Sequence, residues 1–468
     1  KPARAGTPLG VAVATALAES LKQNATITTI ELRHNKIGEA GATAMAERLN
    51  KNENKTKTNH KNKVYQIENF LIRLLRGSGL TGLFDARILI KNGASVTVIY
   101  RKTIGWGASS RNGGMATPGL KQGIQKIHKM YGAKLAHEFW KISVDAIDLI
   151  DEFVADHSID CDWERNGHAS LATKPSHAPR LKEYGSWLEK EFGHYQKYIP
   201  KHQIRDEIGS DTYYGALTDE ISGGLHPSKY VFGLASTVSN LGVQLCENTA
   251  VTKIENNDSN NFKLITSKGD INAKKVIIAT NGYTDRLVPK LKPLIFPVGS
   301  YIVVTEPLTN ELQNIINPKR RMYYDSKWFL NYFRLTPDGR MLWGGRNDLS
   351  TDLDLDDSAK RLSKELYTVF PDLKDIPITH TWTGKLGITF DLMPHIGKTN
   401  GIYYAFGYGG HGLSIATYLG TEIGLMLAGK KDRSPFMEIP HDTTFFYRNR
   451  PWFIPFAARY FRFLDWVS

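Results

Sequence analysis

The stretch Gly77-Ser-Gly79-Leu-Thr-Gly82 decides how the fold of this chain is predicted. A GxGxxG sequence of this kind is typical of dinucleotide binding when it joins a strand to a helix. Gly77 permits a tight turn, Gly79 lets the backbone approach a pyrophosphate, and Gly82 allows the helix to pack closely on the strand. The start of the helix then offers N–H groups and partial positive charge to the phosphates.

The sequence around this stretch supplies the required context. An apolar strand is expected over 71–75, a helix over 84–92 and a second strand over 94–100, which together form a strand–helix–strand unit. Two features depart from the usual pattern. Tyr100 stands where an acidic residue normally binds the ribose, and the first strand carries two arginines, which are costly inside a sheet unless they are paired. Taken alone, the stretch is also compatible with a purely structural turn.

Three further glycine-rich turns strengthen the prediction of an extended ligand site. Residues 105–114 leave backbone N–H groups accessible soon after the second strand. Thr280-Asn-Gly282 ends the apolar run 276–279, a position that faces ligands in α/β sheets. Gly407-Tyr-Gly-Gly-His-Gly412 again ends a strand and begins a helix. Each turn alone is more economically read as structural, but four of them in one chain favour a cofactor.

The composition limits the class of protein. The 468 residues include 60 Lys and Arg against 47 Asp and Glu, and the formal charge is +13. Part of the excess lies in residues 51–63, which contain no interleaved aromatic side chains, so we expect a solvated linker rather than a nucleic-acid site. Only Cys161 and Cys246 occur, which excludes a disulfide framework and a Cys-based zinc ribbon and predicts a reducing, cytoplasmic location. We expect no metal. No apolar run reaches the ~18 residues of a membrane span.

An internal echo marks the first 50 residues. The segment 14–21, Ala-Thr-Ala-Leu-Ala-Glu-Ser-Leu, is echoed 28 positions later by 42–49, Ala-Thr-Ala-Met-Ala-Glu-Arg-Leu, and alternating apolar residues with Asn35 lie between the two copies. This spacing resembles a leucine-rich repeat, although about three repeats are needed to bury a continuous core. We expect a short leucine-rich-repeat-like fragment over 1–50 and a possible protein partner there. A pair of ordinary amphipathic helices is the alternative.

From about Gly77 onwards the chain resembles the D-amino-acid-oxidase superfamily of FAD-dependent oxidoreductases, and most closely its gamma-glutamylputrescine-oxidase-like members. The resemblance covers some four-fifths of the chain and is carried by Ile104-Gly-Trp-Gly-Ala-Ser-Ser-Arg-Asn-Gly-Gly114, Gly224-Leu-His-Pro227, Ala279-Thr-Asn-Gly-Tyr-Thr284, Pro297-Val-Gly-Ser-Tyr301, Asn331-Tyr-Phe-Arg-Leu-Thr-Pro-Asp-Gly-Arg340, Phe390-Asp-Leu-Met-Pro394, Gly407–Gly412 and Arg450-Pro-Trp-Phe453.

The resemblance implies an α/β fold in which a Rossmann-type FAD-binding domain is interleaved with an α+β substrate domain. The expected FAD-binding segments are 64–125, 218–292 and 378–430, and the expected substrate-domain segments are 126–217 and 293–377. A C-terminal tail over 431–468 is aromatic and basic. We expect it to pack as a helix on the enzyme body, with a membrane surface as the alternative.

The resemblance also implies the residues that contact FAD. The pyrophosphate and the flavin would be held by Gly77, Gly79, Gly82, Ser109, Ser110, Arg111, Asn112, Gly113, Thr280, Gly282, Gly410, His411 and Gly412, and Val251 would meet the adenosine half through its backbone. In such a turn His411 is either an acid–base group or a side chain that packs near the flavin ring.

The substrate is expected to meet the aromatic-rich strands of 295–346. Tyr301, Tyr323, Tyr324, Trp328 and Tyr332 are candidates for an aromatic wall around an alkylammonium, and a half-buried aromatic sheet is the alternative for each. Arg334 and Arg346 suit a substrate carboxylate, with solvated surface arginines as the alternative. We assign His411, Tyr301 and Arg346 to catalysis, and Tyr324, Trp328, Tyr332 and Arg334 to substrate binding.

These expectations lead to an FAD-dependent amine or amino-acid oxidase. Hydride would pass from the substrate to the flavin, the imine would hydrolyse, and dioxygen would reoxidise the flavin to give hydrogen peroxide. The expected partners are a small-molecule amine or amino acid and dioxygen, without nucleic acid. The alternative is an inactive flavoprotein-fold remnant joined to a repeat-type interaction segment.

Overall fold

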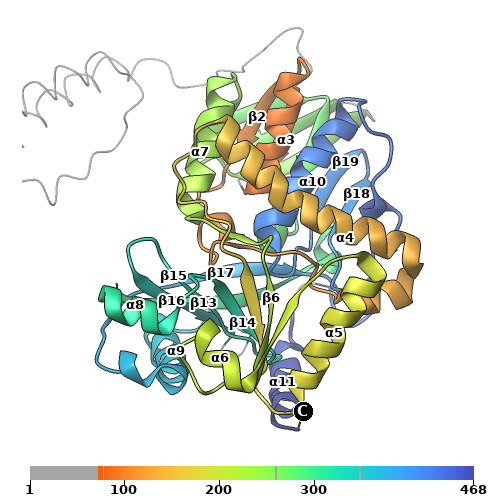
Figure 1. Ribbon diagram of the computed structural model, residues 1–468. Coiled ribbons are helices and arrows are strands. Elements are labelled where there is room, and N and C mark those ends of the chain that lie inside the picture. The colour runs from red at the N-terminus through yellow and green to blue at the C-terminus, as the bar shows by residue number, and fades with distance from the viewer. Residues whose placement is uncertain (1–71, 77–78, 259–260, 347–348, 449, 468) are drawn as a thin grey trace, which may run out of the picture. The chain divides into compact units, whose positions relative to one another are not determined.

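The computed structural model describes residues 72–76, 79–258, 261–346, 349–448 and 450–467, and residues 72–76 and 257–258 by their backbone alone. The leucine-rich-repeat-like fragment 1–50, the basic linker 51–63 and Gly77 lie outside the described residues. For the part from residue 72 onwards, two large sheets organise the fold (Figure 1).

A six-stranded sheet forms the first layer. Its strand order is β18-β19-β12-β1-β2-β8, and its members are β1 (Ile72–Arg76), β2 (Ser95–Ile99), β8 (Gln244–Cys246), β12 (Lys275–Ile278), β18 (His395–Thr399) and β19 (Ile402–Phe406). All neighbours are parallel except β18 and β19. The expected strand–helix–strand unit is present, because α3 (Leu80–Lys91) connects β1 to β2.

Helices cover this sheet and bury its apolar side chains. Four of them are α3, α4 (Ile124–Asp156), α7 (Pro227–Asn240) and α10 (Gly412–Leu427), which lie beside the sheet in Figure 1. The approach of α10 to α3 requires glycine, since a Cβ at Gly420 would lie 2.4 Å from the carbonyl oxygen of Thr81. The ring centroids of Phe84 on α3 and Phe153 on α4 lie 4.8 Å apart, so the two helices share one core.

Two small sheets accompany the first layer. β9 (Val251–Asp258), β10 (Asn261–Thr266) and β11 (Gly269–Ala273) form an antiparallel meander, and β3 (Met115–Ala116) pairs with β7 (Gly223–Gly224). Across the described ranges, no helix is both long and apolar enough to cross a membrane.

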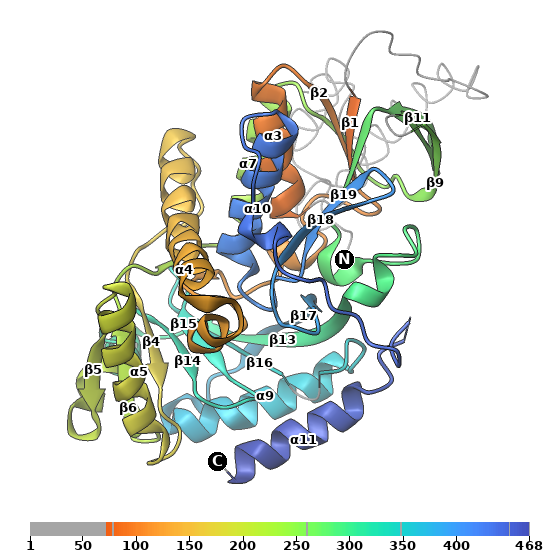
Figure 2. The same ribbon diagram turned by 90° about the vertical axis from the view of Figure 1, so that its right-hand side faces the viewer.

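The second layer is an eight-stranded mixed sheet with the order β17-β13-β16-β15-β14-β4-β6-β5. Its strands are β4 (His168–Leu171), β5 (Lys197–Pro200), β6 (Gly215–Asp219), β13 (Phe296–Pro307), β14 (Met322–Asp325), β15 (Tyr332–Leu335), β16 (Arg340–Gly345) and β17 (Ile378–Ile388). Its helices are α5 (His177–Phe192), α6 (Ile204–Glu207), α8 (Asn310–Ile316) and α9 (Leu355–Val369). One face of the sheet buries Trp343, Phe333 and Tyr323 against α9. Figure 2 shows α9 and the C-terminal helix α11 (Ile454–Val467) below β13 and β16, away from the first layer.

Two segments cross the domain boundaries that we expected. Strand β17, assigned to the FAD-binding segment 378–430, pairs with β13 along most of its length and therefore belongs to the eight-stranded sheet. Helix α4, assigned to the substrate segment 126–217, buries Phe139, Ile147 and Phe153 in the core of the first layer. The chain therefore passes between the two layers several times, and β17 and α4 lie in the opposite layer from the one that we expected.

Candidate active site

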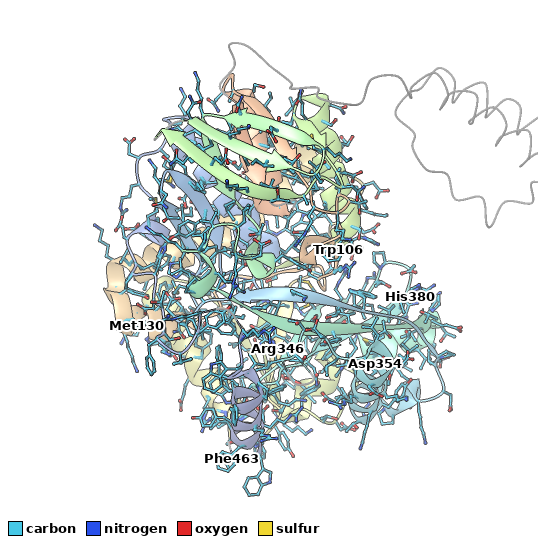
Figure 3. The ribbon with its side chains drawn as sticks, turned by 180° about the vertical axis from the view of Figure 1, so that it is seen from behind. Trp106, Met130, Arg346, Asp354, His380 and Phe463 are labelled. Atoms are coloured by element: carbon cyan, nitrogen blue, oxygen red, sulfur yellow. The ribbon has the colours of Figure 1, made fainter. Side chains whose placement is uncertain are left out.

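A single cavity of about 1130 Å³ reaches from the C-terminal ends of the parallel strands to one face of the eight-stranded sheet. Gly79 and Tyr100 line the end at the six-stranded sheet, whereas Tyr324 and Arg346 line the end at the larger sheet. In Figure 3 Arg346 lies in the central part of the view, close to strands of the larger sheet. The cavity exceeds the range of about 300–1,000 Å³ typical of small-ligand pockets, so it offers room for a large cofactor together with a substrate.

The start of α3 closes one side of the cavity. The N–H of Leu80 donates to Ser109 Oγ at 3.3 Å, and a Cβ at Gly79 would lie only 2.6 Å from the same oxygen. Gly79 has φ −83°, so the position favours glycine for close approach and not for a left-handed backbone. Gly82 lies buried within α3, does not line the cavity, and acts in packing.

Tyr100 occupies the expected ribose position in an unusual way. The side chain is 1% exposed and lines the cavity, and its hydroxyl has no hydrogen-bond partner among the described residues. Burial, aided by Glu247, raises the pKa of the phenol, so the hydroxyl stays protonated and available as a donor. Arg101 points into solvent beside Asp285, 3.8 Å away.

The loop that carries Ser109 and Asn112 is held by its own side chains. Asn112 Nδ2 donates to the carbonyl oxygens of Ala108 and Ser109 at 3.1 and 2.8 Å, and its Oδ1 accepts from the N–H of Gly114 at 2.8 Å. The indole N–H of Trp382 donates to the carbonyl of Arg111 at 2.9 Å, which ties the loop to β17. Ser109, Arg111, Asn112 and Gly113 all line the cavity. Ser110 does not, because its hydroxyl is buried beside Gly105.

Arg334 supports this loop and does not face a substrate. Its Nε donates to the carbonyl of Gly113 at 2.8 Å, and its Nη2 donates to the carbonyl of Leu225 at 2.6 Å. Burial lowers the pKa of the guanidinium to about 10, and Arg334 does not line the cavity. The assignment of Arg334 to substrate binding is therefore corrected: the expectation overlooked two backbone carbonyls that need a donor.

The remaining expected cofactor residues line the cavity from other strands. Thr280 and Gly282 follow β12, and a Cβ at Gly282 would lie 2.6 Å from the carbonyl oxygen of Lys385. Val251 lines the cavity at the start of β9. Gly410 and Gly412 line it before α10, and Gly410 has φ +114°, which side chains rarely adopt.

Basic side chains converge near this last turn. A Cβ at Gly409 would lie 2.5 Å from that of Lys121, and one at Gly410 would lie 3.7 Å from Nη2 of Arg346. The charge of Arg346, with burial, lowers the pKa of Lys121 to about 7. Burial, together with the Lys121 and Arg346 charges, lowers the pKa of His411 to about 3, so His411 is neutral at ordinary pH. This part of the cavity therefore favours a negative group.

A row of cross-strand neighbours forms the wall at the larger sheet. Gly344, Tyr332, Tyr324 and Ser170 stand opposite one another on β16, β15, β14 and β4. The ring of Tyr332 lies over Gly344, where a Cβ would be 2.2 Å from the ring, and it also contacts Gly113, where a Cβ would be 2.9 Å away. The phenol of Tyr332 is 3.0 Å from Ser300 Oγ. Tyr332 and Tyr324 both line the cavity, and Tyr332 contacts the loop that carries Ser109 and Asn112, hereafter the cofactor loop. Their assignment to substrate binding stays a prediction.

Tyr301 and Trp328 do not reach the cavity. Strand alternation turns Ser300 to the cavity and Tyr301 to the opposite core, where its hydroxyl donates to the carbonyl of Ser350 and accepts from the N–H of Leu353, each at 3.0 Å. Trp328 is 53% exposed and stacks on Phe461 of α11. Tyr323 is buried in the same core as Tyr301. The catalytic assignment of Tyr301 and the substrate assignment of Trp328 are corrected.

Three cavity residues had no signal in the sequence. Lys121 stands in an ordinary loop, His168 on a short strand, and Gln196 just before β5. None of them belongs to a motif, and only the tertiary fold brings them to one cavity.

The cavity wall fits FAD. No side chain of the described residues other than Ser109 caps the start of α3, so the helix is open to a phosphate. Of the described residues that line the cavity, seven are lysine or arginine and one, Asp325, is acidic, which suits an anionic pyrophosphate. The unpaired hydroxyl of Tyr100 suits a ribose oxygen. No cluster of metal-ligating side chains occurs in the described part of the chain.

Comparison with known proteins identifies the family of the chain. Residues 77–424 match the DAO family, described as FAD dependent oxidoreductase. The chain therefore belongs to this family of FAD-dependent enzymes.

Individual relatives cover most of the same region. The chain is 34% identical over 370 residues to the probable oxidoreductase OrdL of Haemophilus influenzae, covering 77% of this chain and 84% of that protein. It is 33% identical over 368 residues to gamma-glutamylputrescine oxidoreductase of Escherichia coli, covering 78% and 85%. Among solved structures, glycine oxidase from Geobacillus kaustophilus aligns with a TM-score of 0.68 at 18% identity, over 81% of this chain and 99% of that one. At that identity the structure supports the fold alone.

Proposed function

We propose that this enzyme oxidises an amine that carries a carboxylate away from the reacting nitrogen, with gamma-glutamylputrescine as the first compound to test. The observation that carries the proposal is the meeting of Lys121 and Arg346 with the tyrosine wall in one cavity. The guanidinium of Arg346 suits a carboxylate, the partly neutral Lys121 beside it suits proton transfer, and the faces of Tyr332 and Tyr324 suit an alkylammonium. The similarity to gamma-glutamylputrescine oxidoreductase supports the same substrate class.

The cofactor would be held by the start of α3, the loop around Ser109 and Asn112, and the turn before α10. FAD, when bound, supplies the two-electron acceptor for oxidation of the carbon–nitrogen bond. The chain itself contributes orientation, exclusion of water and a proton acceptor. With a pKa of about 7, Nζ of Lys121 is partly neutral at pH 7 and can take a proton from a substrate ammonium. The released imine then reacts with water to give a carbonyl product and ammonia, or an amine where the nitrogen carries a second substituent.

His411 plays a different part in this proposal. Its pKa of about 3 keeps the ring neutral during turnover, so His411 does not supply a proton at neutral pH. We propose that it packs beside the cofactor and shapes the turn before α10, and that Lys121 replaces it as the group that handles a proton.

The first experiment is an absorbance spectrum of the purified protein, followed by peroxide assays with gamma-glutamylputrescine, sarcosine and glycine. We expect flavin bands and the highest kcat/KM with gamma-glutamylputrescine. A protein without flavin bands, even after incubation with FAD, would support the alternative of an inactive remnant. Flavin-loaded protein that turns over none of the three compounds would contradict the substrate proposal.

The second experiment tests the carboxylate anchor. Arg346→Lys should raise KM about tenfold with less effect on kcat, because the anchor binds the substrate before and during reaction alike. Arg340→Lys is the matched control, since Arg340 begins β16, the strand that Arg346 directly follows, but pairs with Asp338 at 2.7 Å and does not line the cavity. Equal KM values for the two variants would place the carboxylate elsewhere.

A further inference from the structure

We propose that a distal arm of the cavity, formed by His168, Ser170, Tyr184 and Gln196, binds an uncharged amide in the non-reacting part of the substrate. The inference rests on the proposed function for the identity of the reacting end. It adds a second recognition site, with its own chemistry, to the cavity. All four residues line the same cavity as the cofactor loop.

Strand order places this arm away from the reacting end. Tyr332 contacts the cofactor loop at Gly113, and Tyr324 and then Ser170 are its successive cross-strand neighbours. Because neighbouring strands lie about 4.8 Å apart, Ser170 is roughly 10 Å from Tyr332 along the sheet. Gln196 lies further on, just before β5, the last strand of the sheet.

The arm is built from neutral hydrogen-bonding groups. The ring of His168 stacks on Tyr324 at 5.2 Å, and its two nitrogens lie 2.7 Å from Ser222 Oγ and 3.2 Å from the Tyr324 hydroxyl. Burial lowers the pKa of His168 and raises the pKa values of Tyr324 and Tyr184. All three side chains are therefore uncharged at neutral pH.

Gln196 provides the arm with a hydrogen-bond acceptor. Its Nε2 donates to Asp219 Oδ2 at 2.9 Å, so the amide group is fixed. The same carboxylate oxygen lies 2.6 Å from Nε2 of His194, which stabilises its charge. Oε1 of Gln196 is buried and has no partner among the described residues. A ligand N–H would satisfy this oxygen.

The charges near the arm argue against an ionic end group there. Lys121 and Arg346 gather at the turn before α10, not in the arm. The carboxylate of Asp325, which also lines the cavity, is already paired with Lys327 at 3.2 Å. A carboxylate in the arm would lose its hydration and meet the carboxylate of Asp219 behind Gln196 without gaining a counter-charge, whereas an amide can both donate and accept. A long amine that contains an amide therefore fits better than a short amine.

The test compares two substrates of equal length, an N-acyl diamine and an alkylamine without the amide, in three proteins. For the unaltered enzyme we expect kcat/KM to favour the amide by about tenfold or more. Gln196→Leu should reduce this ratio about tenfold. Tyr195→Leu is the matched control, because Tyr195 is the preceding residue and is 66% exposed; the ratio should stay unchanged. Ser170→Ala is the second arm variant and should lower the ratio by a smaller factor.

A binding measurement separates this inference from the proposed function. Calorimetric titration with a simple N-alkyl amide that has no amine needs no turnover. We expect the affinity to fall about tenfold in Gln196→Leu and to persist in Tyr195→Leu. If the unaltered, flavin-loaded protein oxidises none of the amines but still binds the amide, only the proposed function is refuted. An amide preference or affinity that is equal in Gln196→Leu and the unaltered protein would overturn the distal arm.

Discussion

Replacing Tyr100 by phenylalanine should have opposite effects on the flavin-free and the flavin-bound protein. The hydroxyl is buried without a partner among the described residues, and a buried unsatisfied polar group costs about 1–3 kcal/mol. In flavin-free protein, Tyr100→Phe should therefore raise the free energy of unfolding by about 1 kcal/mol or more. If the hydroxyl bonds a ribose oxygen, the same change should weaken FAD binding about tenfold, which corresponds to about 1.4 kcal/mol.

Urea unfolding of flavin-free protein and titration with FAD measure the two effects separately. Tyr213→Phe is the matched control, since Tyr213 is equally buried with an unpaired hydroxyl but does not line the cavity. It should stabilise the flavin-free protein and leave FAD affinity unchanged. Unchanged FAD affinity in Tyr100→Phe would show that the hydroxyl does not face the ribose. A lower unfolding free energy would show that it has a partner in the flavin-free protein.

Three further changes test other parts of the site. Gly79→Val should abolish flavin absorbance while far-UV circular dichroism is retained, because Gly79 lines the cavity and a side chain there would fill the space that the pyrophosphate needs; a full flavin complement would contradict the placement of the cofactor. Arg334→Met should lower the free energy of unfolding by about 3 kcal/mol, since two carbonyls lose charged donors. If the variant instead has a raised KM and an unchanged free energy of unfolding in urea, Arg334 binds the substrate. Lys121 has a pKa of about 7 in the folded protein and near 10.4 in the unfolded chain. Between these pH values the unfolded chain binds a proton that the folded protein does not. The free energy of unfolding therefore rises with pH in this range, by at most about 1.4 kcal/mol per pH unit. Lys121→Met should remove this slope from urea midpoints measured between pH 7 and 10, and an unchanged slope would refute the assignment.

The cofactor side of the cavity could be predicted from local sequence. Gly79, Asn112 and Gly410 sit in turns that join a strand to a helix or follow one closely, and such turns are specified by a few adjacent residues. Their place at one cavity follows from the parallel strand order, because the carboxyl ends of parallel strands meet at one edge. Each of these residues lines the cavity.

The substrate side depended on contacts that a single sequence does not reveal. Tyr332 and Arg334 share one face of β15, yet only Tyr332 meets the cavity, because carbonyls from two distant loops engage Arg334. Trp328 lies outside the cavity because its ring stacks on Phe461 of α11, a helix more than a hundred residues later in the chain. Figure 3 shows Phe463 on the same helix, at the outer edge of the protein. The direction of Tyr301 follows from strand alternation, because the adjacent Ser300 faces the cavity and Tyr301 must face the opposite core.

The strand order of the six-stranded sheet also determines how late in synthesis this sheet can be completed. The central strand β1 pairs with β12, and β12 pairs with β19, whose last residue is Phe406. The face of α3 that meets α10 stays uncovered until Leu427 has been added, about 350 residues after β1. At roughly 5–20 residues per second, the ribosome needs about 20–70 s for this stretch. During that interval the nascent chain exposes apolar surface that only its last third can cover, so aggregation competes with folding before any flavin can be loaded.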